Sequence, residues 1–270
     1  MSRLTSTAII LKTKLYGERD LIVDLFTETH GRTRVIAKGA LNSKKRYMGA
    51  LEVGHLVKVD YVIKPGLSTL GPCDVLQRQW QIRQNLHALQ QMYYTLELCL
   101  LATPLEEKDE AFYQSLVELL AALESGPGLP ELYIFAWELR LFAHLGYELN
   151  IGRCPLTGHS PDGISAQLGG CISSSAGKPY WPVRTEALRV LYRLQHSGDI
   201  KDLYLSKQDQ EQIRTAFVGC WSYITGSKLQ SYSVFEQVDL NLDQCHKQTE
   251  VELETITPAI HTSFHSTPSV

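Results

Sequence analysis

The spacing of apolar residues changes at Trp80, and this change limits the folds that the chain can adopt. Before Trp80, short runs rich in β-branched residues alternate between apolar and polar positions, which is typical of strands. After it, apolar residues recur at steps of three and four, which is typical of amphipathic helices. The pattern predicts an α+β chain with a strand-rich domain at 1–80 and a helical domain at 81–237.

Five runs in the first domain are expected to be strands. They cover 7–13, 21–27, 32–38, 57–63 and 70–80. Residues 16–20 are expected to form a turn between the first and second runs, and His30-Gly31 is a tight turn signal between the second and third. Five short strands in so few residues favour a small closed barrel or a sandwich. Residues 39–49, between the third and fourth runs, are expected to form a polar, basic loop.

Helical spacing covers most of the second domain. Helices are expected at 83–102, at 107–124, from Pro130 to Gly146, at 183–197 and at 207–225. Ser206 and Asp209 resemble an N-terminal capping pair for the last helix. Residues 151–182 are rich in Gly, Ser and Pro and are expected to form an irregular insert. Residues 238–270 are polar without periodicity, which predicts a disordered tail.

Positive charge is concentrated at the front of the chain. The formal net charge is -3, yet residues 1–70 hold 12 Lys and Arg against 6 Asp and Glu. Such a local excess favours a site for a polyanion, with a chance surface imbalance as the alternative. Lys and Arg displace the counterions that condense on a phosphate backbone. The candidate DNA-binding residues are Arg32, Arg34, Lys38, Lys44, Lys45 and Arg46, and, in a second group, Lys12 and Lys14.

The third strand gives these cations a shared direction. Alternation places Arg32 and Arg34 on one side of the strand, and Lys38 follows on the same side. Tyr47 is the one aromatic residue of the basic loop that could stack on a base. The alternative interpretation is a solvated hairpin edge, whose charge protects it against aggregation.

The six cysteines are widely scattered, so free thiols are more plausible than a disulfide framework. Cys154 and Cys171 nevertheless raise the question of zinc, with His159 as a third candidate ligand. A zinc knuckle supplies two cysteines, but Thr157 and Ser174 stand in the second places here. The residues therefore favour two free thiols and no cofactor, and zinc stays a secondary possibility.

The motifs that carry common enzyme chemistry are missing from the sequence. There is no G-x-S-x-G, no P-loop, no H-E-x-x-H and no G-x-G-x-x-G before a helix. We therefore expect a protein that is not an enzyme, with a metal-dependent enzyme centred on the insert as a rival. The sequence shows no secretory leader and no apolar run of about 20 residues, which predicts a cytoplasmic protein without membrane contact.

Taken in order, several stretches resemble proteins of the RecO family. They are Ala8-Ile9-Ile10-Leu11, Tyr16-Gly17-Glu18-Arg19-Asp20, Gly31-Arg32-Thr33-Arg34-Val35-Ile36-Ala37-Lys38-Gly39-Ala40 and Phe135-Ala136-Trp137-Glu138-Leu139-Arg140-Leu141. The resemblance covers roughly residues 5–235. It implies an N-terminal OB-fold β-barrel and a helical domain. In many members it also implies a zinc module near 154–174, of which this insert would be a degenerate version.

The resemblance also implies a function in DNA repair and recombination. Such a protein would bind single- and double-stranded DNA and anneal complementary strands. It would help to load RecA, together with RecR, on gaps coated by single-strand-binding protein, and would recognise the acidic tail of that protein. The expected location is cytoplasmic and nucleoid-associated. The main alternative is a protein–protein adaptor that uses the OB-fold for partners. A groove for the acidic tail would need an apolar lining and a basic rim, for which Leu139, Arg140 and Phe142 are candidates.

Overall fold

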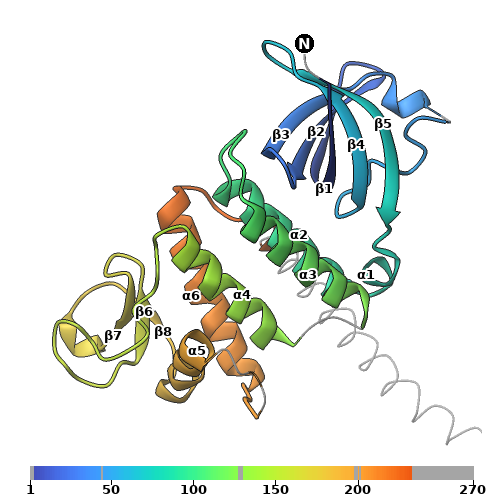
Figure 1. Ribbon diagram of the computed structural model, residues 1–270. Coiled ribbons are helices and arrows are strands. Elements are labelled where there is room, and N and C mark those ends of the chain that lie inside the picture. Colours follow the sequence, from blue (N-terminus) through green and yellow to red (C-terminus); the bar gives the residue numbers. More distant parts are fainter. Residues whose placement is uncertain (1–2, 44, 127–129, 198–199, 201, 233–270) are drawn as a thin grey trace, which may run out of the picture. The chain divides into compact units, whose positions relative to one another are not determined.

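The computed structural model describes residues 3–43, 45–126, 130–197, 200 and 202–232. Its first part is a closed barrel with the strand order β1-β2-β3-β5-β4 (Figure 1). Neighbouring strands are antiparallel except β3 and β5, which pair in parallel. The strands are β1 (Arg3–Tyr16), β2 (Asp20–Thr27), β3 (Gly31–Ala37), β4 (Leu56–Val62) and β5 (Ser68–Gln77). The expected five-stranded OB-fold barrel is confirmed.

Strand β1 is longer than its sequence run suggested because it pairs with two neighbours. Its first half pairs with β4, and its second half pairs with β2 as far as Tyr16, opposite Asp20. The register shifts between Ile10 and Lys12, which marks a bulge. A bulge bends a strand and increases its twist. Tyr16 therefore belongs to a strand, although the sequence placed it in a turn.

Alternate residues of the strands fill the barrel. The buried cluster includes Ala8 and Ile10 of β1, Val23 and Leu25 of β2, and Val35 and Ala37 of β3. The residues between them therefore point to the outside of the barrel, as strand geometry requires.

Six helices of the described chain carry the second part. They are α1 (Trp80–Gln84), α2 (Leu86–Ala102), α3 (Glu110–Glu124), α4 (Glu131–His144), α5 (Thr185–Ser197) and α6 (Lys207–Thr225). The helix expected at 83–102 is in fact two helices. Asn85 has an extended backbone, and its side chain accepts a hydrogen bond from the backbone N–H of Ala88, so it caps a new helix. Helix α6 has the expected bounds, and the capping box of Ser206 and Asp209 is confirmed.

One end of the barrel's outer side is covered by the helices. Phe26 is fully buried, with its ring centroid 5.5 Å from that of Phe112 and 5.7 Å from that of Tyr113 on α3. Strand pairing places Phe26 opposite Ile9 on one side and opposite Arg32 on the other. The Arg32 guanidinium donates a hydrogen bond to the carbonyl of Leu100 in α2. This row of side chains joins the barrel to α2 and α3.

The turn between β2 and β3 fits tightly against the segment that precedes α3. Gly31 has a φ of +64°, and a Cβ there would lie 1.7 Å from the carbonyl oxygen of Glu107. The backbone N–H of Glu106 donates to the carbonyl of Arg32 at 2.8 Å. Only glycine suits a position with both this φ and this approach of another backbone.

The insert is more regular than expected. It contains a small sheet in the order β7-β6-β8, formed by β6 (Gly163–Ser165), β7 (Gly170–Ile172) and β8 (Trp181–Pro182). Strands this short cannot display an alternating pattern, so sequence reasoning did not find them. Two 3-10 turns complete the described elements, η1 (Ala40–Asn42) and η2 (Ser174–Ala176).

The barrel and α1 to α6 belong to one compact unit, which ends at Leu229. The disordered tail expected at 238–270 lies outside the described residues. The division into domains at 1–80, 81–237 and 238–270 stays a prediction. Among the described helices, none combines the length and apolar character that a membrane crossing requires.

Candidate nucleic-acid interface

Beyond the row of Phe26, the helices leave the outer face of β1, β2 and β3 uncovered. This part of the barrel carries cations from both groups of candidate DNA-binding residues. Pairing places Lys12 opposite Asp24 and Asp24 opposite Arg34. The next outward row joins Lys14, Ile22 and Ile36. We call the open face the set Lys12, Lys14, Tyr16, Ile22 and Arg34, together with Lys38, which directly follows β3. The sheet thus brings together cations that lie far apart in the sequence.

Three lysines of the open face are available to a ligand. Lys12, Lys14 and Lys38 are all exposed. In the part of the chain that the structure describes, no hydrogen bond or ion pair engages their amino groups. Three such groups can each meet a phosphate without first breaking an internal contact.

Arg34 is exposed but already has a partner. Its Nε lies 2.8 Å from Oδ1 of Asp24, and its second guanidinium nitrogen lies 3.1 Å from Oδ2. Asp24 is 5% exposed, so this carboxylate is covered by the arginine. The hydrogen bond to Asp24 raises the pKa of Arg34. Because the charge of Arg34 is already paired with Asp24, Arg34 attracts an anion less strongly than an unpaired lysine of the open face does.

Arg32 does not reach the open face. Burial lowers the pKa of its guanidinium, which bonds the carbonyl of Leu100, and its Nε is buried without a hydrogen-bond partner. Arg32 and Arg34 do lie on the same side of β3, as the alternation predicted. The helices separate them, however, because they cover the first and stop short of the second.

The basic loop begins beside the open face. The backbone N–H of Gly39 donates to Asp20 at 2.7 Å, and that of Leu41 donates to the carbonyl of Arg19 at 3.1 Å. Both bonds tie the start of the loop to the turn between β1 and β2. Farther along, Lys45 and Arg46 are exposed. Lys44 lies outside the described residues.

The expectation that Tyr47 offers a ring to a base is wrong. Tyr47 is 3% exposed, and its hydroxyl donates to the carbonyl of Leu70 at 2.8 Å. The ring belongs to the buried cluster of the barrel, and the Arg46 guanidinium lies 5.2 Å from its centroid. The exposed aromatic ring of the open face is instead Tyr16, which is 53% exposed. Its spacing of two and four residues from Lys14 and Lys12 was the signal in the sequence.

The described residues of the insert do not fit a zinc site. Cys154 and Cys171 are each 1% exposed, whereas His159 is exposed and its Nδ1 lies 3.4 Å from the hydroxyl of Ser175. Among the described side chains, no group of three His, Cys, Asp or Glu converges as metal ligands would. A hydrogen bond from the Thr157 hydroxyl lowers the pKa of Cys154 to about 7. Ser174, in the other knuckle position, bonds Asp162 at 2.6 Å.

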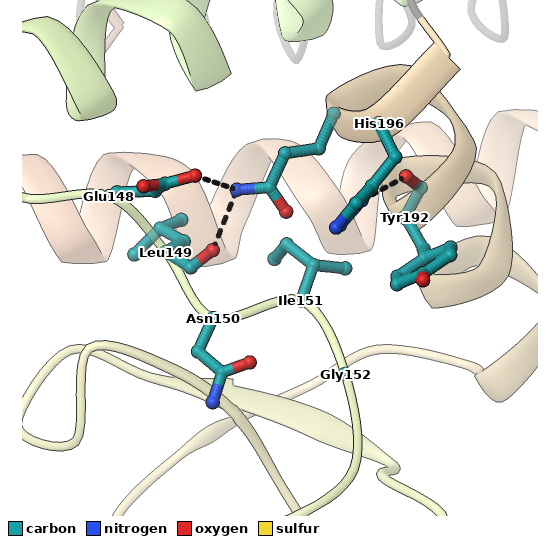
Figure 2. Close-up of a pocket in the computed structure, with 8 residues that line it drawn as sticks. Glu148, Leu149, Asn150, Ile151, Gly152, Tyr192 and His196 are labelled. Carbon is teal, nitrogen blue, oxygen red and sulfur yellow. Dashed lines mark hydrogen bonds between the residues drawn. The ribbon is translucent and has the colours of Figure 1, made fainter.

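A pocket of about 330 Å³ lies between residues 148–152 and α5 (Figure 2). The Gln195 amide donates to Glu148 at 3.3 Å and to the carbonyl of Leu149 at 2.9 Å. The Nδ1–H of His196 donates to the carbonyl of Tyr192, 2.9 Å away. The rings of Tyr192 and His196 stack with their centroids 4.0 Å apart, but among the described residues that line this pocket no hydrogen bond joins a hydroxyl to a histidine. No barrel residue contributes to it.

The groove suggested for an acidic peptide is not formed by the residues named for it. Leu139 is 3% exposed and Phe142 is fully buried, so neither can line an open groove. Arg140 alone of the three is exposed. Helix α4 is covered on most sides, and the regular spacing of its apolar residues reflects packing in the core rather than a surface for a partner.

Comparisons with known proteins complete the description of the chain. The family model described as Recombination protein O N terminal matches residues 1–79, and that described as Recombination protein O C terminal matches 83–233. A protein named DNA repair protein RecO from Geobacter sulfurreducens is 32% identical over 202 residues, 73% of this chain and 83% of its own length. Its namesake from Geobacter metallireducens is 28% identical over 246 residues, 88% of this chain and 99% of its own length.

Proposed function

Since the chain belongs to the RecO family of DNA repair proteins, we propose that it binds single- and double-stranded DNA through the open face of its barrel. The main phosphate contacts are made by Lys12, Lys14 and Lys38. The positive electrostatic potential around them is increased by Arg34, Lys45 and Arg46. The protein anneals complementary strands. With RecR, it helps to load RecA on gaps coated by single-strand-binding protein, whose acidic tail it recognises. It acts in the cytoplasm, at the nucleoid, and makes or breaks no bond itself.

One observation carries the proposal. The pairing of β1, β2 and β3 sets the unengaged Lys12 and Lys14 in line with Arg34, and the unengaged Lys38 follows directly after β3. A surface of this kind suits a polymer of regularly spaced negative charges. The chain after residue 70 is acidic on balance, so the attraction for a polyanion is concentrated in the barrel.

Annealing follows from the same electrostatics. Two DNA strands repel each other through their phosphates, and each lysine that neutralises a phosphate reduces that repulsion. A strand held by its backbone keeps its base edges free to pair. The proposed activity therefore needs cations and an open surface, and it needs no catalytic group.

We expect the triple variant Lys12→Gln, Lys14→Gln, Lys38→Gln to bind DNA more weakly and with less sensitivity to salt. Each lost phosphate contact on a single strand lowers the slope of log affinity against log salt by about 0.7, so three contacts lower it by about 2. The measurement is fluorescence anisotropy with labelled oligo-dT across a range of salt concentrations.

A matched control removes three exposed lysines elsewhere, at Lys178, Lys207 and Lys228. This control variant should keep the slope of the unmodified protein. An unchanged slope in the triple variant of the open face would remove the phosphate contacts from these lysines. No DNA binding by the unmodified protein at moderate salt would favour the protein–protein adaptor instead.

A further inference from the structure

Tyr16 holds an unusual position on the open face. It is the last residue of β1 and pairs with Asp20, so its ring stands at the end of the strand, beside the turn to β2. Lys14 and Lys12 precede it on the same side of the strand, at intervals of roughly 6.6 Å for every two residues. The ring therefore continues a line of two cationic side chains.

An apolar surface adjoins the ring. Lys14 lies opposite Ile22, which makes Tyr16 and Ile22 diagonal neighbours on the same side of the sheet. Diagonal neighbours are about 7–8 Å apart, which is within reach of an aromatic side chain. Ile22 is partly exposed. The flat ring and the isoleucine together offer a base an apolar platform between cations.

Other exposed tyrosines lack these surroundings. Tyr204 is 82% exposed and Tyr223 is 61% exposed, but both belong to the helical part of the chain. Of the barrel's aromatic residues that the structure describes, Phe26, Tyr47 and Tyr61 are buried and Tyr16 is exposed. Exposure alone does not distinguish Tyr16; its place beside the unengaged lysines does.

We propose that Tyr16 stacks on an unpaired base of a single strand whose phosphates lie on Lys12, Lys14 and Lys38. This inference rests on the proposed function and makes single-stranded DNA the preferred ligand of the open face. Base–aromatic stacking is tolerant of sequence because every base has a flat π-face. A duplex keeps its bases stacked on one another, so it meets the lysines but gains nothing from Tyr16.

Stacking of this kind is compatible with annealing. The ring contacts the face of a base and leaves its pairing edge open to solvent. A strand held on Tyr16 and the lysines can therefore begin to pair with a complementary strand before it is released. The same side chains would bind and present the strand.

The experiment compares Tyr16→Ala, Tyr16→Phe and the control Tyr204→Ala in the full chain, with labelled oligo-dT and a duplex of equal length as probes. Tyr16→Ala should weaken oligo-dT binding by roughly 5- to 150-fold, the range for loss of one stacked base. Tyr16→Phe and Tyr204→Ala should bind as the unmodified protein does. Duplex affinity and the salt slope should not change in any of the three, and neither should the melting temperature.

Two results separate the failure of this inference from the failure of the proposed function. If Tyr16→Ala weakens both probes equally, or neither, while the triple lysine variant still flattens the salt slope, the stacking is wrong and the phosphate contacts stand. If the triple lysine variant leaves the slope unchanged as well, the open face is not the DNA site and both proposals are overturned.

Discussion

Replacement of Arg214 by methionine is expected to lower the free energy of unfolding by about 3–5 kcal/mol. Arg214 of α6 donates hydrogen bonds to Glu138 and Glu131 of α4, and its guanidinium lies 4.5 Å from the centroid of the Tyr94 ring. Glu138 is fully buried and also accepts from the Tyr94 hydroxyl at 2.9 Å and the Trp221 indole at 3.2 Å. Methionine would leave Glu138 buried without its cation.

The loss of stability in Arg214→Met should depend on pH. Burial raises the pKa of Glu138 even beside Arg214, and removal of the arginine would raise it further. Between the ordinary carboxyl pKa of about 4.3 and the raised one, the folded state binds more protons than the unfolded state. Its stability therefore falls as pH rises. Urea unfolding of Arg214→Met should show a deficit that is smallest at low pH and grows towards neutral pH.

A second substitution separates the charge from the packing. Glu138→Gln in the Arg214→Met background should recover part of the stability and remove the added pH dependence, because the amide can still accept from Tyr94 and Trp221. Arg189→Met, at an exposed position on α5, should change stability by less than about 0.5 kcal/mol. A deficit in Arg214→Met that is small, or equal at every pH, would contradict the assignment of a buried ion cluster.

Phe26→Ala is expected to destabilise the protein by about 3–5 kcal/mol. The ring is fully buried between the barrel and α3, where it meets Phe112 and Tyr113 edge-on or tilted. Alanine would leave a cavity that the rigid barrel cannot close, and it would remove both ring contacts. Tyr16→Ala, an exposed ring on the same side of the sheet, is the matched control and should cost less than about 0.5 kcal/mol.

Tryptophan fluorescence makes this test sharper. All four tryptophans of the chain lie after residue 79, so their signal reports the unfolding of the helical part and the insert. Phe26 belongs to the barrel. If the junction makes barrel and helices unfold together, Phe26→Ala shifts the tryptophan transition to lower denaturant. A tryptophan transition that stays in place while the barrel unfolds early would show that the two parts are not coupled.

The number of strands and the main helices could be predicted because they depend on local patterns. Alternation over β3 and three- to four-residue steps over α6 are visible within ten to twenty residues. The break at Asn85 was missed because helical spacing continues across it. An asparagine can cap a helix as well as stand inside one, and only the tertiary structure decides between the two.

The candidate site was predicted in part. The sequence identified Lys12, Lys14 and Lys38 as cations but treated them as two groups. The pairing of β1 with β2 and of β2 with β3 sets Lys12 and Lys14 beside the strand that Lys38 follows, and this register is a long-range property. Arg32 was indistinguishable from Arg34 in the sequence, because both occupy the outer side of one strand. The helices that cover the first arginine come more than 60 residues later.

The predicted positions of Tyr47 and Tyr16 were wrong for a similar reason. The sequence placed Tyr47 in a polar loop and therefore at the surface, whereas the loop folds inward there to close the barrel. Tyr16 was placed in a turn because the β-rich run ends at residue 13, whereas pairing with β2 extends the strand to Tyr16. A chain that gains hydrogen bonds from a neighbouring strand can continue past the end of its own pattern.

Footprinting of lysine reactivity tests most directly whether DNA lies on the open face. The protein would be treated with an amine-acetylating reagent, with and without saturating oligo-dT, and each lysine would be quantified by mass spectrometry. Lys12, Lys14 and Lys38 should lose reactivity when the strand is bound, while Lys178 and Lys207 react as before. Unchanged reactivity at the first three, with protection appearing at lysines of the helical part instead, would contradict the account.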